Sequence, residues 1–438
     1  MSMKLARNEV ILPYGRGELR LNVPAQSRVL CPARREHVAD ISAAVCEALE
    51  APVAGPRFSH WVQGAERVLI VVSDQTRTCH NSEILPVLLR ALNAAGVADE
   101  KLRLVVAYGA HQAMGEAQAS AVLGEEVMKR VRVWHHDARA DADLVYLGDT
   151  KRGTPITLNR MAVDIGKVIL VGAITPHYFA GFTGGRKSIC PGLAGLETIV
   201  ANHKLTVHSD PQVGLDPFCK SGVLDGNPVH EDTLEAASMI RNVFLLNIVV
   251  GADTVVGVVA GDMVEAHGHG CTVATQGVRV EIDKLADVVV ASCGGYPADI
   301  DLVQAHKALR HAREGLRNGG RLLFVAECAE GVGSPYIEKW LDYRDVAGMH
   351  EAMRANYTLN SQTALSLRTI TNTAEVFMKS SLREATVEKV GCRHVATWSG
   401  MLEESVGAIL PAETVYVMPN AAHTVPEMHQ GGHGAHPD

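Results

Sequence analysis

The sequence predicts an α/β protein with two α/β domains, each built on a mainly parallel, Rossmann-like sheet. Short β-branched runs alternate with longer amphipathic stretches, as in residues 67–73 followed by residues 82–95. Continuous apolar runs of this kind are typical of parallel strands that helices cover on both faces. The alternation restarts after about residue 275, and 438 residues fit two or three domains at roughly 150 residues each. We therefore expect one domain over residues 1–274 and a second over residues 275–438.

The same pattern predicts the individual elements. In the first domain we expect strands at residues 67–73, 102–107, 131–134 and 167–172, and helices at residues 82–95 and about 114–131. In the second domain we expect strands at residues 286–292, 320–326, 376–378 and 413–418, and a helix at residues 299–318.

Composition excludes several classes of protein. Apolar residues make up 47% and charged residues 21% of the chain, which is the balance of a globular protein and not of a disordered chain or a coiled coil. The net charge of −8 argues against nucleic acid or an anionic membrane as a partner, since both favour a basic surface. No apolar run approaches 18 residues, and residues 1–13 lack the apolar core and cleavage site of a secretory signal. We expect a cytoplasmic protein.

Cysteine usage supports the same location. The nine cysteines are an odd number and form no CxxC pair, which argues against a disulfide framework or a zinc ribbon. We expect reduced, mostly buried thiols. The 20 histidines are more than this length predicts, so they direct attention to metal and proton-transfer sites.

Ligands of open parallel sheets bind outside the carboxyl ends of the strands, so the residues after each predicted strand are the candidates. Asp74, Gln75, Thr76 and Arg77 follow the first strand. An arginine beside hydroxyls and a carboxylate suits an anionic ligand, although Asp74 or Thr76 could equally cap the following helix. His111 follows the second strand, where a histidine is either structural or catalytic.

The richest segment is residues 172–192, which contains His177, three clustered glycines and Lys187. Glycines let a backbone approach a ligand closely. The GxxxxGK[ST] spacing of a nucleoside-triphosphate-binding loop is absent, which disfavours a Walker-type protein. His177 and His203 are 26 residues apart and match no zinc template, which leaves open a soft-metal site built from sequence-distant residues.

A fourth segment, residues 293–297, comes directly after a strand of the second domain. Gln304 and Lys307 lie on the helix that follows, and positions i and i+3 share one face of a helix. The pair could bind one ligand from this domain, or it could simply form a solvated helix face.

Taken together, these segments resemble the nickel-dependent lactate racemase family, whose members are nickel-pincer nucleotide racemases and epimerases of 2-hydroxy acids. Five motifs occur in family order over residues 74–307. They are Asp74-x-Thr76-Arg77, Gly109-x-His111, Pro176-His177-x-x-Ala180-Gly181-x-x-Gly184-Gly185-x-Lys187, Ala201-Asn202-His203, and Gly294-Gly295-Tyr296-Pro297 followed by Gln304-x-x-Lys307.

The resemblance implies a cofactor and a set of roles. The cofactor would be nickel in a nickel-pincer nucleotide, Ni(II)-pyridinium-3,5-bisthiocarboxylate mononucleotide, attached through Lys187. His203 would be the nickel ligand from the protein, in the square-planar geometry that suits this metal. The remaining implied roles are nucleotide contacts for Asp74, Gln75, Thr76 and Arg77, acid/base catalysis for His111 and His177, and substrate binding for Arg77, Gln304 and Lys307.

These residue types fit the implied chemistry. Direct deprotonation of a 2-hydroxy acid at C2 is difficult, whereas removal of that hydrogen as hydride is easier when a base takes the hydroxyl proton. The product is a planar 2-keto acid, and return of hydride to its other face inverts C2. Two histidines suit this role because each titrates near neutral pH. Since the bases and the substrate binders fall in different domains, we expect the active site in the interdomain cleft.

Two departures from the family pattern concern the substrate. Val303 stands where the lactate enzymes carry an aromatic residue, and residues 360–367 contain no tryptophan. Both favour a 2-hydroxy acid other than lactate, with malate, aromatic and sugar acids as candidates. A dicarboxylate would need an additional cation, for which Arg186 or His306 is available. Proteins that mature the cofactor would be partners. The alternative is a phosphate- or nucleotide-binding α/β protein without nickel redox chemistry.

Overall fold

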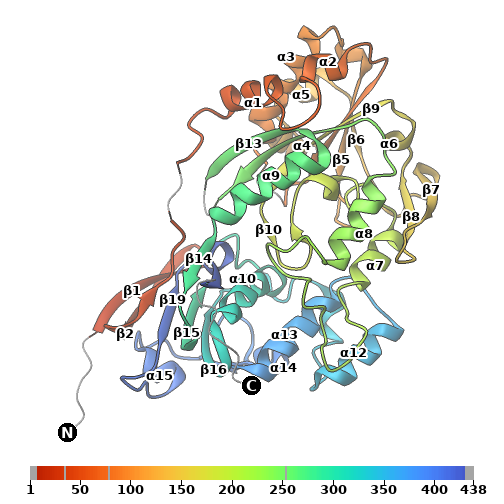
Figure 1. The fold of residues 1–438 in the computed structure, drawn as a ribbon. Helices are drawn as coiled ribbons and strands as arrows, with labels where there is room; N and C mark the ends of the chain where they lie inside the picture. The colour runs from red at the N-terminus through yellow and green to blue at the C-terminus, as the bar shows by residue number, and fades with distance from the viewer. Residues whose placement is uncertain (1–6, 34–35, 77–78, 252–253, 430–438) are drawn as a thin grey trace, which may run out of the picture. The chain divides into compact units, whose positions relative to one another are not determined.

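A computed structural model describes residues 7–33, 36–76, 79–251 and 254–429 (Figure 1). Its contacts divide the chain into two compact units. The larger unit comprises residues 34–206 and 216–277, and the smaller unit comprises residues 1–33, 207–215 and 278–438. The main boundary lies three residues beyond the predicted one, but two segments that we assigned to the first domain belong to the smaller unit.

The reason for this difference is contact between segments that lie far apart in the sequence. β3 (Arg28–Val29) extends the sheet of the smaller unit by pairing with β19 (Val415–Met418). His350 contacts the His208 carbonyl oxygen through Nε2 at 2.7 Å, which ties residues 207–215 to the same unit. A reading of local patterns along the chain does not detect either pairing.

The larger unit is built on a six-stranded sheet with the order β13-β12-β9-β4-β5-β6. All neighbours are parallel except β12 and β13. The strands are β4 (Val68–Ser73), β5 (Leu102–Ala107), β6 (Val133–His135), β9 (Lys167–Ile174), β12 (Val243–Val250) and β13 (Val255–Asp262). β4 is the sequence VLIVVS with its first five residues buried, as expected of a strand that is covered on both faces.

Helices cover the two faces of this sheet. The helices of the larger unit are α1 (Ile41–Glu50), α2 (Phe58–Val62), α3 (Asn81–Ala94), α4 (Glu116–Leu123), α5 (Glu125–Arg130), α6 (Arg160–Asp164), α7 (Leu196–Lys204), α8 (Pro228–Ala237) and α9 (Met263–Gln276). The apolar sides of α1 to α5 share one core with alternate residues of the sheet strands. α9 packs on β12 and β13. The predicted helix over residues 114–131 is divided at Gly124, whose φ of +92° is outside the helical region.

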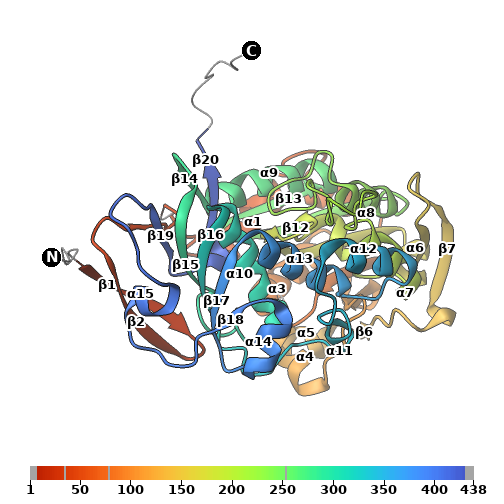
Figure 2. The same ribbon diagram turned by 90° about the horizontal axis from the view of Figure 1, so that it is seen from below.

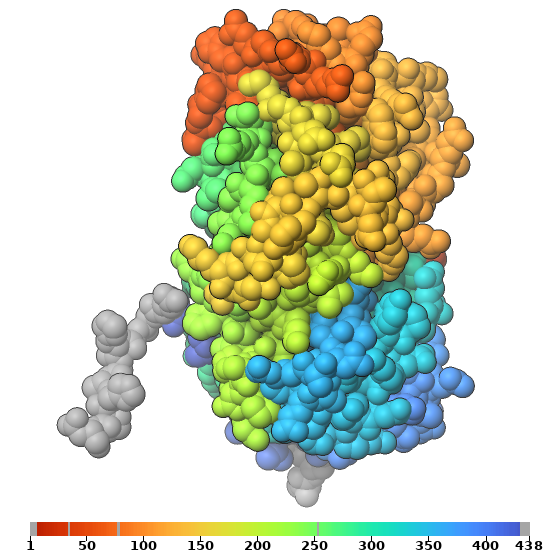
Figure 3. Space-filling model, turned by 90° about the vertical axis from the view of Figure 1, so that its right-hand side faces the viewer, coloured from red at the N-terminus to blue at the C-terminus, as the bar shows by residue number. Residues whose placement is uncertain are grey.

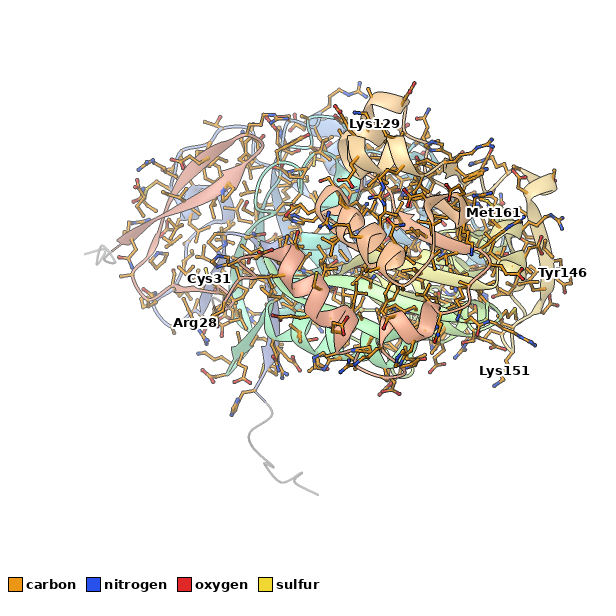
Figure 4. All side chains as sticks on the ribbon, turned by 90° about the horizontal axis from the view of Figure 1, so that it is seen from above. Arg28, Cys31, Lys129, Tyr146, Lys151 and Met161 are labelled. Carbon is orange, nitrogen blue, oxygen red and sulfur yellow. The ribbon has the colours of Figure 1, made fainter. Side chains whose placement is uncertain are left out.

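Two small hairpins belong to the larger unit. They are β7 (Leu144–Asp149) with β8 (Pro155–Asn159), and β10 (Pro176–His177) with β11 (Gly181–Phe182). The first hairpin, coloured yellow, lies on the surface in Figure 3. Tyr146 projects from it in Figure 4 and is 60% exposed. The second hairpin carries His177 and is buried.

The smaller unit is built on a six-stranded, fully parallel sheet with the order β18-β17-β16-β15-β19-β3. Its remaining strands are β1 (Arg7–Tyr14), β2 (Gly17–Pro24), β14 (Arg279–Ile282), β15 (Ala286–Ser292), β16 (Leu316–Val325), β17 (Glu375–Lys379), β18 (Arg393–His394) and β20 (Val425–Met428). Its helices are α10 (Leu302–Glu314), α11 (Pro335–Glu338), α12 (Val346–Ala355), α13 (Ser361–Thr373), α14 (Glu384–Val390) and α15 (Leu402–Val406).

Each face of this sheet has its own apolar core. One core joins the sheet to α10, α12 and α13, and the other joins it to the β1–β2 hairpin and α15, which lie together in Figure 2. The predicted helix over residues 299–318 is shorter in the structure, because Asp301 caps α10 and β16 begins at Leu316. The predicted α/β class with parallel sheets is confirmed. Among the described residues no helix is long and apolar enough to cross a membrane.

Candidate active site

The candidate residues of the larger unit gather where the order of its sheet reverses. From β4 the chain continues to β5 and β6 on one side, and then returns to β9 and β12 on the other side. Loops at such a switch point form the ligand site of open α/β sheets. Asp74 follows β4 directly, His111 comes four residues after β5, and His177 comes three residues after β9.

Asp74 and His111 form a direct pair. The distance from His111 Nδ1 to Asp74 Oδ2 is 2.6 Å, and the other oxygen of Asp74 accepts hydrogen bonds from Thr76 N at 3.0 Å and Thr76 Oγ1 at 2.6 Å. The Asp74 side chain is 4% exposed, whereas the His111 side chain is 52% exposed. The carboxylate therefore holds the proton of His111 on Nδ1, which leaves the lone pair on Nε2 for a ligand.

The turn that carries His111 is fixed to the loop that carries Lys187. Gly109 N donates to Gly192 O at 2.9 Å, and Gly192 N donates to Lys187 O at 3.0 Å. Two backbone hydrogen bonds in series therefore connect the two candidate residues, although they are 76 positions apart in the sequence.

His177 lies in a tight hairpin in which only glycine fits at the position paired with it. His177 pairs with Gly181, which has a φ of +75°. A Cβ at Gly181 would lie 2.2 Å from Val223 O, so only glycine fits. His177 Nδ1 lies 3.3 Å from Ala180 N and 3.5 Å from Phe179 N, so it accepts long backbone contacts. In the neutral ring the proton is then on Nε2, which is the opposite arrangement from His111.

Phe179 joins three candidate residues that come from different segments. Its ring centroid is 4.5 Å from that of His177, 5.0 Å from that of His203 and 5.3 Å from Lys187 Nζ. Phe179 is 5% exposed. Phe179 was not among the residues predicted to be functional, and the available signal in the sequence was its place between His177 and the glycine cluster.

His203 lies in the last turn of α7. Burial and the nearby positive charge of Lys187 lower the pKa of His203 to about 3, so the imidazole is neutral at pH 7. A neutral imidazole keeps one nitrogen lone pair for a metal. The neighbouring Asn202 donates to Asp232 Oδ2 at 2.8 Å, which fixes this end of α7 to α8.

Arg186, next to Lys187, is a buried cation. It is 1% exposed, and its guanidinium donates to Ala180 O at 2.9 Å and Phe182 O at 3.3 Å and lies 2.7 Å from His267 Nε2. Burial lowers the pKa of Arg186 to about 10, which leaves it charged at pH 7. Arg186 thus stabilises the loop through contacts inside the protein, and its guanidinium does not face a ligand.

The prediction that Arg186 or His306 could bind a second carboxylate is therefore wrong. His306 is 0% exposed and lies 2.7 Å from Ser366 Oγ through Nε2. Burial holds the pKa of His306 well below its usual range, so it is not a cation at pH 7.

Gln304 and Lys307 lie on α10 in the smaller unit. Lys307 Nζ donates to Gln304 Oε1 at 2.6 Å, which leaves the amide nitrogen of Gln304 as a donor next to the ammonium. Asp301 caps the helix by accepting from Gln304 N at 2.7 Å. Val303 is half-buried and packs against the core of this unit. Residues 360–367 fall at the start of α13, with Ser361 to Leu367 buried.

The other candidates are described only in part. Arg77 lies outside the described residues. Thr76 is exposed, and Gln75 Oε1 is buried without a hydrogen-bond partner among the described residues. No group of three or more histidine, cysteine, aspartate or glutamate side chains could hold a metal within the described ranges. A metal site made of protein ligands alone, which the sequence left open, is therefore not found there.

Comparison with known proteins covers a large part of each unit of the fold. The family described as the lactate racemase N-terminal domain matches residues 14–214, and the lactate racemase C-terminal domain matches residues 282–425. A lactate racemase from Thermoanaerobacterium thermosaccharolyticum is 30% identical over 334 residues, which is 75% of this chain and 76% of that protein. The chain belongs to the lactate racemase family. It is therefore an isomerase, and the predicted family is confirmed.

Other members of the lactate racemase family and solved structures agree. A lactate racemase from Lactiplantibacillus plantarum is 31% identical over 66% of each chain. The structure of the lactate racemase apoprotein from Thermoanaerobacterium thermosaccharolyticum matches with a TM-score of 0.86 at 26% identity, covering 96% of this chain and 100% of that one. A Thermotoga maritima protein matches with a TM-score of 0.66 at 18% identity and supports the fold alone, covering 90% of this chain and 100% of that one.

Proposed function

We propose that this member of the lactate racemase family inverts C2 of a 2-hydroxy acid by reversible hydride transfer through a 2-keto acid. The observation that carries the proposal is the grouping of the Asp74–His111 pair, His177, Lys187 and His203 at the switch point of one sheet. The reaction needs acid/base groups and residues that hold the cofactor. Two histidines for proton transfer, a lysine and a neutral histidine in one place match this need.

The residues fit a nickel-pincer nucleotide. Lys187 would hold it as a thioamide, and His203, neutral at pH 7, would complete the coordination of nickel. The nucleotide would contact Gln75, Thr76 and Arg77. The side-chain oxygen of Gln75 is buried and lacks a partner among the described residues. When bound, this cofactor supplies the hydride acceptor.

The Asp74–His111 contact supports a role for Asp74 beyond the nucleotide contact that the family resemblance implies. A carboxylate offers no donor to a phosphate, and both oxygens of Asp74 already accept from His111 and Thr76. We propose that Asp74 orients His111 and stabilises its imidazolium after Nε2 takes the hydroxyl proton of the substrate. This is the role that a buried carboxylate has beside a catalytic histidine.

His177 would serve the opposite enantiomer. With Nδ1 accepting from the backbone, its Nε2 begins as a donor to the substrate oxygen, whereas Nε2 of His111 begins as an acceptor. To take the hydroxyl proton of the opposite enantiomer on Nε2, and to return a proton as the imidazolium, His177 must carry a proton on Nδ1. Catalysis by His177 in either direction therefore requires it to give up its two long backbone contacts.

Gln304 and Lys307 would bind the substrate carboxylate. The amide nitrogen of Gln304 and the ammonium of Lys307 are adjacent donors, and a fixed cation retains the keto acid between the two hydride transfers. His111 and His177 belong to the larger unit, whereas Gln304 and Lys307 belong to the smaller unit.

Val303 and the absence of a tryptophan over residues 360–367 favour a substrate with a larger side chain than lactate. Nickel-loaded protein should be incubated with single enantiomers of lactate, malate, aromatic lactates and sugar acids, and analysed by chiral chromatography. We expect racemisation or epimerisation of at least one larger acid, and none by the Lys187→Ala variant. No conversion of any acid by protein that carries the cofactor would contradict the proposal.

Absorbance and intact mass separate this proposal from a nucleotide-binding protein without nickel chemistry. Loaded protein should absorb well beyond 300 nm and show a covalent adduct. We propose proteins that build and load the cofactor as partners, and no nucleic acid or membrane. We place the enzyme in the cytoplasm, which agrees with its nine free cysteines.

A further inference from the structure

The sheet of the smaller unit also has a switch point, where the turn of the β1–β2 hairpin lies. From β15 the chain continues to β16 and β17 on one side, and later returns to β19 on the other. Ligands of open sheets bind outside the strand ends at this point. Here the turn of the β1–β2 hairpin contacts the loops instead. Gly15 O accepts from Tyr296 N at 2.7 Å, and Tyr14 OH lies 3.3 Å from Ser381 Oγ.

Asp299 is the polar centre of this contact. It is 1% exposed, and its Oδ2 accepts from Gly15 N at 2.8 Å and from Glu327 N at 3.1 Å. Its carbonyl oxygen accepts from Cys328 N at 2.8 Å. One buried residue therefore joins the hairpin turn, the loop after β15 and the loop after β16.

The same segment leads directly into α10. Asp301, two residues later, caps the helix, and Leu302 N donates to Gly331 O at 3.0 Å. Gln304 and Lys307 occupy the first two turns of α10. The backbone of those turns is thus held by Asp301 and Gly331, and Gly331 N in turn donates to the carbonyl oxygen of Cys328, a partner of Asp299, at 2.9 Å.

We propose that Asp299 is a positioning residue for substrate binding, and that the N-terminal hairpin turn is the fixed support against which it holds the start of α10. The inference rests on the proposed role of Gln304 and Lys307 in binding the substrate carboxylate. It assigns a function to residues 14–16, which lie nearly 300 positions before the helix that they support.

A side chain at the centre of the hairpin turn would displace the Glu327 side chain. Gly15 has a φ of +54°, and a Cβ there would lie 1.9 Å from Glu327 Oε2. A Gly15→Ala variant should therefore disturb the two hydrogen bonds that Asp299 accepts from Gly15 N and Glu327 N. Gly319 provides the matched control, because its φ is +68° and the nearest atom to an added Cβ is 3.9 Å away.

Three variants of loaded enzyme test the proposal. Asp299→Ala removes the acceptor, Asp299→Asn keeps one side-chain oxygen, and Asp287→Ala removes a carboxylate that accepts from Thr414 N elsewhere in the same unit. We expect Asp299→Ala to raise KM by on the order of 10–10²-fold while kcat changes little, because a displaced binding group costs this much. Asp299→Asn and Asp287→Ala should stay near wild type.

Amide hydrogen exchange gives a readout independent of activity. In Asp299→Ala the amides of Gly15, Glu327 and the first turn of α10 should exchange faster, and those of the larger unit should not. Gly15→Ala should reproduce both effects and Gly319→Ala neither. If Asp299→Ala does not fold, the comparison of Gly15→Ala with Gly319→Ala decides.

The outcomes separate the inference from the proposed function. Unchanged exchange in α10, or an unchanged KM despite faster exchange, would overturn the inference while racemase activity stands. If no 2-hydroxy acid is converted by wild-type enzyme, the proposed function fails. The exchange data then still show whether Asp299 and the hairpin turn hold α10.

Discussion

The two sheets of this protein have similar architecture and use their switch points differently. In the larger unit the loops after β4, β5 and β9 carry Asp74, His111 and His177. In the smaller unit the corresponding place is taken by the turn of the β1–β2 hairpin, which binds Tyr296 and Asp299. In our proposals, similar sheets therefore carry the acid/base residues in one unit and a supported helix in the other.

The difference teaches that function in this protein follows from the loops and not from the sheets. In the larger unit the His111 side chain is open, with 52% of it exposed, although Asp74 and His177 beside the same switch point are buried. The loops of the smaller unit direct their polar groups inward, as the 1% exposure of Asp299 shows. A change in the first set should alter chemistry, and a change in the second set should alter binding or stability.

The largest effect should come from Lys187→Ala. Without the lysine no covalent adduct forms, so intact mass should show apoprotein and activity should fall to background. His203→Ala should keep the adduct and lose part of the nickel, since the cofactor's own donors remain. Lys204→Ala, at an exposed position on the same helix as His203, is the control. Full nickel retention in both the Lys187 and the His203 variants would contradict these roles.

Replacing either acid/base histidine should be the next largest effect. His111→Ala and His177→Ala should each lose on the order of 10²–10⁴-fold in turnover in both directions, since the equilibrium between mirror-image substrates cannot change. In rapid mixing, each variant should still transfer hydride quickly from one enantiomer, and the fast enantiomer should differ between the two.

Asp74→Asn sharpens this test. The variant keeps the shape of the side chain and loses the carboxylate that holds the proton on His111 Nδ1. We expect it to slow hydride transfer only from the enantiomer that His111 serves. Equal slowing of both enantiomers would show that Asp74 acts on something other than His111.

The loss of stability in acid should report on the buried His311 of the smaller unit. Burial lowers the pKa of His311 from 6.5 to about 4, and its Nδ1 lies 2.8 Å from Ala421 O. The unfolded chain takes up a proton near pH 6.5 and the folded protein does not, so stability is complete above that pH and is lost as pH falls towards 4. His311 should account for about 3 kcal/mol of this loss.

The variant that tests this is His311→Asn, which retains an N–H donor but does not titrate. Urea unfolding at several pH values should show a shallower decline between pH 6.5 and 4 than in wild type. An unchanged slope would mean that His311 is protonated in the folded protein.

The smallest effect concerns two arginines, the half-buried Arg321 and the buried Arg186. Arg321 in the smaller unit binds both oxygens of Glu413, at 2.7 and 2.8 Å, whereas the described partners of Arg186 are a histidine and two carbonyl oxygens. Arg321→Met leaves a carboxylate unpaired and should lower the free energy of unfolding by about 2 kcal/mol. Arg186→Met removes a buried charge together with its desolvation penalty, so it should change the free energy of unfolding by less than about 1 kcal/mol. Urea unfolding measures both, and a larger loss in Arg186→Met would show that its internal hydrogen bonds dominate.

Sequence patterns predict the regular part of this fold well. Residues 102–107 and 286–292 are strands with the predicted bounds, because buried parallel strands are continuous apolar runs. The division of the 114–131 helix at Gly124 was missed, since one glycine in a helical pattern does not by itself end a helix. The pairing of β3 with β19 was missed because it depends on contacts nearly 400 residues apart.

The sequence allowed us to predict which strand ends carry the candidate residues, but not how their side chains contact one another. The rule that ligands bind at strand ends selected Asp74, His111 and His177 correctly as neighbours of one switch point. Their spacing in the sequence contains no sign that Asp74 binds His111, or that Phe179 contacts His177 and His203. Such contacts depend on side-chain directions, which only the folded chain determines.

The central claim is that C2 is inverted by hydride transfer and not by removal of a proton. It is tested most directly with a single-enantiomer substrate that carries deuterium at C2, incubated with loaded enzyme in ordinary water. Mass spectrometry and chiral chromatography should show deuterium retained at C2 in the inverted product, because the hydride returns to the same carbon. An inverted product whose deuterium has been replaced by hydrogen from water would contradict the account.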